Sequence, residues 1–144
     1  SWSMVEYLDH SLFSIFVAEI DKMEISADGK SYEFDLTAKD SNLTGVSLDG
    51  KEMDVKSFKY LYQSIISIYL HDKYVPNENE SSEEYLRVKI HTETYSPEIV
   101  FYRVSSSKCY FTIDGQGGYY CLVDDVKEAR NRLFKYINGE IITK

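Results

Sequence analysis

The chain has 144 residues, 43% of them hydrophobic, and a formal net charge of −8. This length and composition are typical of one globular domain and argue against disorder. No apolar run approaches the ~18 residues of a membrane-spanning helix, and no secretory signal opens the chain, so we expect a soluble polypeptide. The acidic excess would repel nucleic acids and anionic bilayers, so no nucleic-acid partner is expected. The opening Ser1-Trp2-Ser3 favours a fragment of a longer protein over a complete one.

The first part of the chain predicts a short helix and then three strands. Apolar residues recur at three- or four-residue spacing over residues 5–16, which favours helical turns. Residues 22–26 and 31–37 alternate apolar with polar and flank Asp28-Gly29, the pattern of a β-hairpin. Residues 43–48 predict a third strand, which ends at a turn over residues 49–51.

An amphipathic helix is predicted next. Asp54 is placed to act as its N-cap, and the helix should end before Pro76. The polar, acidic residues 77–84 then predict an exposed connection. The apolar stripe of this helix comprises Val55, Phe58, Leu61, Tyr62, Ile65, Ile66 and Tyr69.

The second part predicts four strands and a final helix. Connections between the strands are too short for parallel crossovers, so an antiparallel meander is expected. Asp125 and Glu128 resemble a capping box, and Asn138-Gly139 is typical of a helix end. The strands are predicted over residues 86–91, 99–104, 108–113 and 119–123, and the helix stripe is Val126, Ala129, Leu133, Tyr136 and Ile137.

Together these elements predict an α+β fold in one domain over residues 1–144, or one module of a larger protein. Two pseudo-halves, residues 1–75 and 85–144, each place strands first and a helix last, and the acidic loop 77–84 joins them. The helices should pack on one face of an antiparallel sheet or of two such sheets. Strand order and oligomeric state do not follow from the pattern.

Candidate chemical motifs are more simply explained by structure. The glycine-rich loop 115–118 lies between two predicted strands, whereas a phosphate loop leads from a strand into a helix. His10, His71 and His91 are far apart and fit no metal-binding spacing. Serines 105–107 predict a polar turn, and the acidic pairs at 83–84 and 124–125 predict a solvated loop and a helix start. We therefore predict no catalytic residue, no cofactor and no metal.

Tyrosine is unusually frequent, with 13 copies beside seven phenylalanines. Neighbouring residues of a strand point to opposite faces, so each aromatic pair in the second half leaves one ring on the face away from the helices. This arrangement is typical either of a half-covered outer face or of a binding platform, and the two can coincide. The predicted contact surface is Tyr102, Tyr110, Tyr119 and Tyr120.

The two cysteines, Cys109 and Cys121, lie on predicted strands either side of a turn and have no CxxC spacing. A cross-strand bridge would form if the hairpin centres on Gly115, whereas a shift of one residue would put them on opposite faces. The alternative is two small buried thiols.

Several segments resemble clostridial members of the domain-of-unknown-function family four-three-four-zero. Residues 54–66, after Leu-Asp-Gly-Lys at 48–51, resemble its "Gly-Lys, then fK-x-x-Yq-x-l-i" segment. The other matching segments are residues 19–25, 101–104, 109–115 and 118–123. The resemblance implies a bacterial protein with a membrane helix outside this chain, α+β modules outside the cytoplasm and an association with ABC-type transporters of the gliding-motility kind. It implies no catalytic residue, and it makes a bond between Cys109 and Cys121 more plausible.

Three functional hypotheses follow. The first is a non-enzymatic extracytoplasmic interaction module that serves a transporter or an envelope assembly through a protein partner. The second is a small-molecule or glycan-binding domain whose tyrosines stack on the ligand and which contains a hollow with inward polar groups. The third is an enzyme of unrecognised type, which would need clustered ionisable residues in one cleft.

Overall fold

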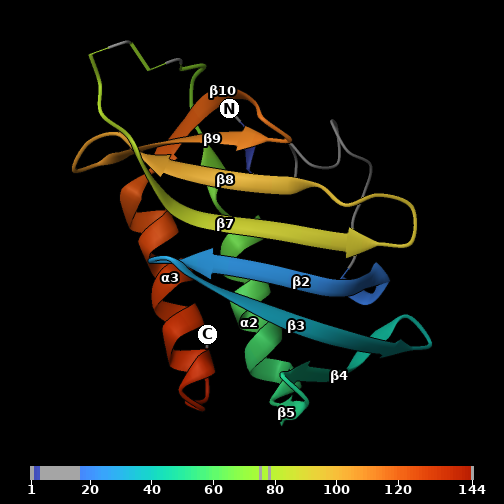
Figure 1. Ribbon diagram of the computed structural model, residues 1–144. Helices are drawn as coiled ribbons and strands as arrows, with labels where there is room; N and C mark the ends of the chain where they lie inside the picture. Colours follow the sequence, from blue (N-terminus) through green and yellow to red (C-terminus); the bar gives the residue numbers. More distant parts are fainter. Residues whose placement is uncertain (1, 4–16, 75, 78, 144) are drawn as a thin grey trace.

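The computed structural model describes residues 2–3, 17–74, 76–77 and 79–143, so the helix predicted over residues 5–16 lies outside the described residues. The fold is α+β, as predicted. One antiparallel sheet has the order β10-β9-β8-β7-β2-β3-β4-β5 (Figure 1). A separate two-stranded sheet pairs β1 with β6. The bounds are β1 Trp2–Ser3, the 3-10 helix η1 Val17–Glu19, β2 Ile20–Ala27, β3 Lys30–Lys39, β4 Asn42–Leu48, β5 Lys51–Met53, α2 Val55–Ile66, β6 Tyr69–Leu70, β7 Glu83–Thr92, β8 Glu98–Arg103, β9 Lys108–Ile113, β10 Gln116–Leu122 and α3 Val123–Ile137.

The strand order follows from two meanders that meet at their first strands. Strands β2 to β5 precede α2, and strands β7 to β10 precede α3. β2 and β7 pair antiparallel, with Ile25 opposite Val88, so both meanders belong to one sheet. The acidic connection predicted over residues 77–84 is shorter than expected, because β7 already begins at Glu83.

Three hairpins turn on an Asp-Gly pair. Asp28 and Gly29 have φ of 53° and 78°, and the pairs at 49–50 and 114–115 have nearly the same values. Positive φ at both central residues is the type I′ turn that matches the twist of paired strands. The hairpin predicted at Asp28-Gly29 is therefore confirmed.

The start of α2 is confirmed and the helix ends before Pro76, as predicted, but its apolar stripe is shorter than predicted. The Asp54 carboxylate accepts the Ser57 backbone N–H at 2.8 Å, and this bond lowers the Asp54 pKa. The helix ends at Ile66, so Tyr69 lies in β6 instead of on the helix stripe. Residues 51–53 form the short strand β5, which the sequence pattern missed because only three residues separate the turn from the N-cap.

The capping box predicted at Asp125 is wrong. Helix α3 begins at Val123 directly after β10, and its N-cap, Leu122, makes no side-chain hydrogen bond. Asp124 and Asp125 instead lie in the first turn, where the helix dipole favours negative charge. The predicted end is confirmed, because Gly139 has φ of 82° and donates its N–H to the Tyr136 carbonyl at 3.0 Å.

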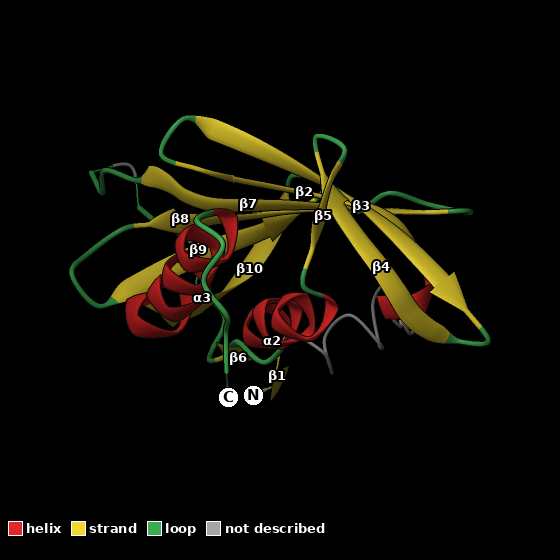
Figure 2. Ribbon diagram, turned by 90° about the horizontal axis from the view of Figure 1, so that it is seen from below, coloured by secondary structure: helices red, strands yellow, loops and turns green. Residues whose placement is uncertain are grey.

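Both helices lie on the same side of the sheet (Figure 2). Their apolar stripes and the inner sheet face form the core, in which the Phe34, Phe58 and Tyr136 rings lie 5.6 to 5.9 Å apart. The Tyr136 hydroxyl donates to the Asp54 carbonyl at 2.8 Å, and burial raises the pKa of Tyr136. The opposite sheet face, hereafter the open face, carries no helix among the described residues.

Arg130 ties α3 to the sheet. Its guanidinium donates to the Tyr85 carbonyl at 2.6 Å and to both Asp28 carboxylate oxygens at 3.0 Å, and it lies 4.1 Å from the Tyr85 ring centroid. These bonds reach the β2–β3 turn and β7 together, so one side chain fixes the helix against both meanders.

Candidate functional site

Three of the four predicted contact tyrosines form a row across the open face. Tyr110 lies opposite Tyr102 on one neighbouring strand and opposite Tyr120 on the other. Directly opposed residues share a face, and the flanking Cys109 and Phe111 are buried in the core, so all three rings point away from the helices. The sequence prediction of rings on this face is met at these three positions.

Tyr119 lies on the other face. It is opposite Phe111, with the two rings stacked at a centroid distance of 6.2 Å, and it packs against the hydrophobic core. The register of β10 shifts between Gly117 and Tyr119, and this irregularity decides which of the two adjacent tyrosines faces outward. The four predicted residues therefore do not form one surface.

The chain after α2 closes the β10 edge and extends this row. The His71 backbone N–H donates to the Tyr120 carbonyl at 2.9 Å, and the Tyr120 backbone N–H donates to the Asp72 carbonyl at 3.3 Å. The Tyr74 backbone N–H donates to the Gly118 carbonyl at 2.7 Å. Residues 71–74 thus act as a further edge segment of the sheet and bring new side chains beside β10.

Ring contacts join these side chains to Tyr110 and Tyr120 of the row. His71 stacks on Tyr120 at 5.0 Å, and Tyr69 meets His71 edge-on at 5.1 Å. Tyr74 lies 6.1 Å from Tyr120 and 6.4 Å from Tyr110, within the range of favourable aromatic pairs. We call this set the aromatic band; it comprises Tyr69, His71, Tyr74, Tyr102, Tyr110 and Tyr120.

One cation is embedded in the aromatic band. The Lys108 ammonium lies 4.5 Å from the Tyr74 ring centroid and 4.6 Å from that of Tyr120, a geometry in which the ring faces attract the charge. The Tyr74 hydroxyl donates to Glu80, and this hydrogen bond raises the pKa of Tyr74. The rings are therefore held by charge and hydrogen bonding as well as by stacking.

Backbone geometry also holds the aromatic band in place. A Cβ added at Gly117 would lie 2.0 Å from the Tyr110 hydroxyl oxygen, so only a glycine leaves room for this ring. At the margin of the aromatic band, Tyr69 is 44% exposed and Leu122 41% exposed. Leu122 lies opposite Lys108 and so belongs to the open face. The aromatic band thus has an accessible apolar margin.

Beyond Val100, which lies opposite Arg87 and Thr112, the open face is mostly polar. At the junction of the two meanders, His91 Nε2 lies 2.6 Å from a Glu24 oxygen, and its Nδ1 lies 3.4 Å from the Ser96 hydroxyl. Beside them, Lys22 pairs with Glu33 on β3. The Ser96–His91–Glu24 chain has the residue types of a hydrolytic triad, but its serine is on an exposed loop and the hydroxyl contact is long for a hydrogen bond.

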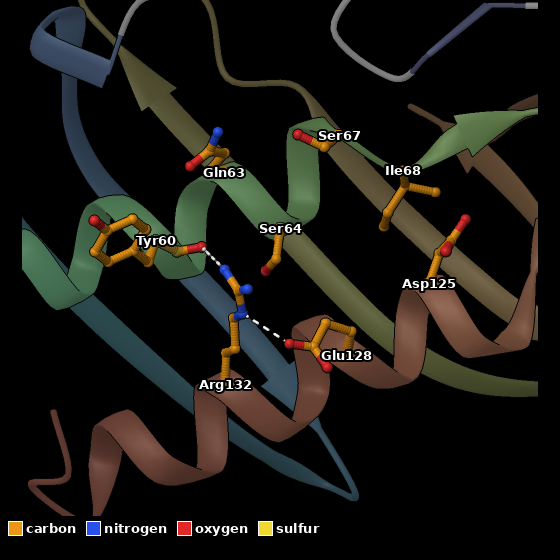
Figure 3. A pocket seen from close by; sticks show the side chains of 8 residues that line it. All are labelled: Tyr60, Gln63, Ser64, Ser67, Ile68, Asp125, Glu128 and Arg132. Atoms are coloured by element: carbon orange, nitrogen blue, oxygen red, sulfur yellow. Dashed lines mark hydrogen bonds and ion pairs between the residues drawn. The ribbon is translucent and has the colours of Figure 1, made fainter. Parts of the chain in front are cut away.

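Three hollows lie away from the aromatic band. One of about 300 Å³ lies between the helices, where Asp125 and Glu128 of α3 face Ser64 of α2 and its C-cap Ser67 (Figure 3). Arg132 crosses it and donates to the Tyr60 carbonyl at 2.7 Å and to Glu128 at 2.9 Å. The others are a groove of about 800 Å³ beside β5 and the start of α2, and one of about 420 Å³ lined by Ser81, Ser82, Glu83, Arg103, Val104 and Ser105.

The two cysteines lie directly opposite each other on β9 and β10, as unbonded thiols. Of the three histidines, His71 belongs to the aromatic band, His91 lies at the junction of the meanders, and His10 is outside the described residues. In the part of the chain that the structure describes, no group of three or more His, Cys, Asp or Glu side chains could hold a metal ion. No helix formed by these residues has the length and apolar character needed to cross a membrane.

Comparisons with protein-family models, with curated proteins and with solved structures find no match for this chain. The resemblance to family four-three-four-zero therefore stays a prediction.

Sequence reasoning missed half of the aromatic band. His71 and Tyr74 follow a helix and carry no strand alternation, so nothing in their spacing places them beside β10. The predicted strand over residues 108–113 includes Lys108. Because neighbouring strand residues point to opposite faces, a buried Cys109 places the Lys108 side chain on the open face.

Proposed function

We propose that this domain is a non-enzymatic interaction module of an extracytoplasmic bacterial protein, and that the aromatic band is its contact surface for a protein partner in a transporter or envelope assembly. The supporting observation is a set of half-buried rings on a sheet face that no described helix covers, with the exposed Leu122 at its margin and a continuation through His71 to the exposed Tyr69. Aromatic side chains are enriched at protein interfaces because they bury a large apolar area at low entropic cost.

The shape of the surface favours a macromolecular partner over a small ligand. None of the three hollows is lined by Tyr102, Tyr110 or Tyr120. A small-molecule site normally encloses most of its ligand in a concavity, whereas two proteins associate through broad, nearly flat surfaces. The stacking rings support the glycan-binding alternative as well, but among the described residues none of these three hollows adjoins the rings on β8, β9 and β10.

Site-specific photo-crosslinking in the native cells tests this proposal. A benzoylphenylalanine placed at Tyr120 or Tyr102 should form an adduct with one membrane-associated protein, identified by mass spectrometry. The matched controls are the same group at Asp35 and at Thr37, which are exposed on β3 of the same face, and these should give no such adduct. Equal labelling from both meanders, or labelling from neither, would count against the aromatic band as the contact surface.

A further inference from the structure

The register of the β9–β10 hairpin brings the two thiols within bonding reach. Cys109 is opposite Cys121 in an unbroken run of pairs from Tyr119↔Phe111 to Leu122↔Lys108. Opposed residues of an antiparallel pair have Cα atoms about 4.5–5.5 Å apart, within the range that a disulfide spans. Both side chains point to the helix-covered face and are fully buried. The position predicted from a turn at Gly115 is therefore the one the hairpin adopts.

The thiols also interact as a pair. A hydrogen bond from Cys121 lowers the pKa of Cys109, with the nearby Arg103 acting in the same direction. The same hydrogen bond raises the pKa of Cys121, and burial adds to that shift. Both shifts belong to the folded chain, in which the two thiols are close enough to share a hydrogen bond.

We propose that Cys109 and Cys121 form a structural cross-strand disulfide in the working protein. The oxidant is a second disulfide, either oxidised glutathione or the active-site disulfide of a thiol–disulfide oxidoreductase. The thiolate of one cysteine attacks one of its sulfurs and releases a thiolate, which leaves a mixed disulfide. The other cysteine then loses its proton and attacks the protein sulfur of the mixed disulfide, which releases the second thiolate. Two protein thiols become one disulfide, and one external disulfide becomes two thiols.

Burial sets the stage at which this reaction occurs. In the folded chain both cysteines are fully buried, and α3 packs on both of their strands, so no external disulfide reaches the sulfurs. Exchange therefore belongs to folding, before α3 packs on the hairpin. The native reduced protein should oxidise slowly, and the unfolded chain should oxidise while it refolds.

The bond would protect the aromatic band as well as the fold. Tyr110 and Tyr120 are the chain neighbours of Cys109 and Cys121, and a slip of one residue between β9 and β10 would turn rings and thiols to the wrong faces. The irregularity at Gly117 and Tyr119 is a point where such a slip could begin. This inference does not need the proposed partner, but it rests on the extracytoplasmic location in the proposed function, because a disulfide persists only in an oxidising compartment.

Refolding under a controlled redox potential tests the proposal. The full chain is reduced and unfolded in guanidinium, refolded with mixtures of reduced and oxidised glutathione, and treated with a maleimide under denaturing conditions. We expect no maleimide adduct, a mass lower by two hydrogen atoms and one Cys109–Cys121 crosslinked peptide. The oxidised protein should melt about 10 °C above the same protein kept in reductant, because the bond restricts the unfolded chain.

Cys109→Ser and Cys121→Ser are the matched controls, and the melting temperature of neither should respond to reductant. If either variant fails to fold, thiol counting and melting of the wild-type chain still decide the question. Two alkylated thiols at every glutathione ratio, a product bearing only glutathione adducts, or an oxidised form that melts no higher than the reduced one would each overturn the proposal.

Discussion

Replacing Gly117 with alanine should damage the hairpin that carries the aromatic band. The added Cβ would lie 2.0 Å from the Tyr110 hydroxyl oxygen and 2.8 Å from the Phe111 carbonyl oxygen. The tyrosine ring can swing away, but the carbonyl belongs to the backbone of the paired strand and can move only if β9 shifts. Overpacking of this kind costs about 1–3 kcal/mol in the free energy of unfolding.

Gly118 provides a matched control one residue away. A Cβ added there meets nothing within 4 Å, and neither glycine has a positive φ, so backbone strain does not distinguish the two sites. We expect Gly118→Ala to change the free energy of unfolding by less than about 0.5 kcal/mol. Both variants would be measured by urea unfolding with linear extrapolation, and the Tyr110 ring would be followed by NMR.

A double-mutant cycle separates the two contacts. In a Tyr110→Ala background the ring clash disappears, so Gly117→Ala should cost less there by the part that the ring contributes. Equal stability of the Gly117→Ala and Gly118→Ala proteins, with an unmoved Tyr110 ring, would refute the close approach of Tyr110 to β10.

Further substitutions test three helix anchors: Asp54, Arg130 and Ser57. Asp54→Ala should cost about 1 kcal/mol in the free energy of unfolding through loss of the N-cap, and Asp54→Asn should cost less. Because folding lowers the pKa of Asp54, its carboxylate stabilises the fold above about pH 4, and this contribution is lost as the pH falls through the lowered pKa. Urea titrations at several pH values would detect the loss. Arg130→Lys should cost about 1–2 kcal/mol in thermal unfolding, because it removes the forked bonds to Asp28 and Tyr85, whereas Asp28→Asn keeps the turn and should cost under about 1 kcal/mol. Ser57→Ala leaves the buried Ile142 N–H, now 2.9 Å from the serine oxygen, without a partner; we expect a loss of about 1–3 kcal/mol and faster proteolysis of the chain end.

The local features of this fold could be predicted, because each depends on a few neighbouring residues. Asp28-Gly29 specifies a hairpin through its positive φ, and Asp54 specifies a helix start through one hydrogen bond. The start of α3 was predicted too late because Leu122 and Val123 are as apolar as strand residues. Acidic residues in the first turn of a helix and at its N-cap look alike in a sequence.

Features that depend on distant pairing could not be predicted. Nothing in β2 or β7 says that these strands meet, since an apolar alternation suits any partner strand. The same limit applies to the aromatic band: Tyr119 and Tyr120 are chemically identical neighbours, and a single register shift sends one to the core and the other to the open face. Residues 71–74, which contain His71 and Tyr74, pair with β10 because that sheet edge lies close to the end of α2 in the folded chain.

The pairing of β2 with β7 also orders the events of folding. Closing a two-residue Asp-Gly turn costs little conformational entropy, so the hairpins can form early. The contact between Ile25 and Val88 joins residues that are far apart in the sequence, so it costs more entropy and forms later. Until that contact forms, Arg130 cannot bridge α3 and the β2–β3 turn. Each meander then exposes a long hydrophobic edge strand whose backbone amides have no strand partner. Slow chain collapse through this contact, not hairpin formation, would then set the refolding rate, and the interval before it is when the protein is most exposed to aggregation.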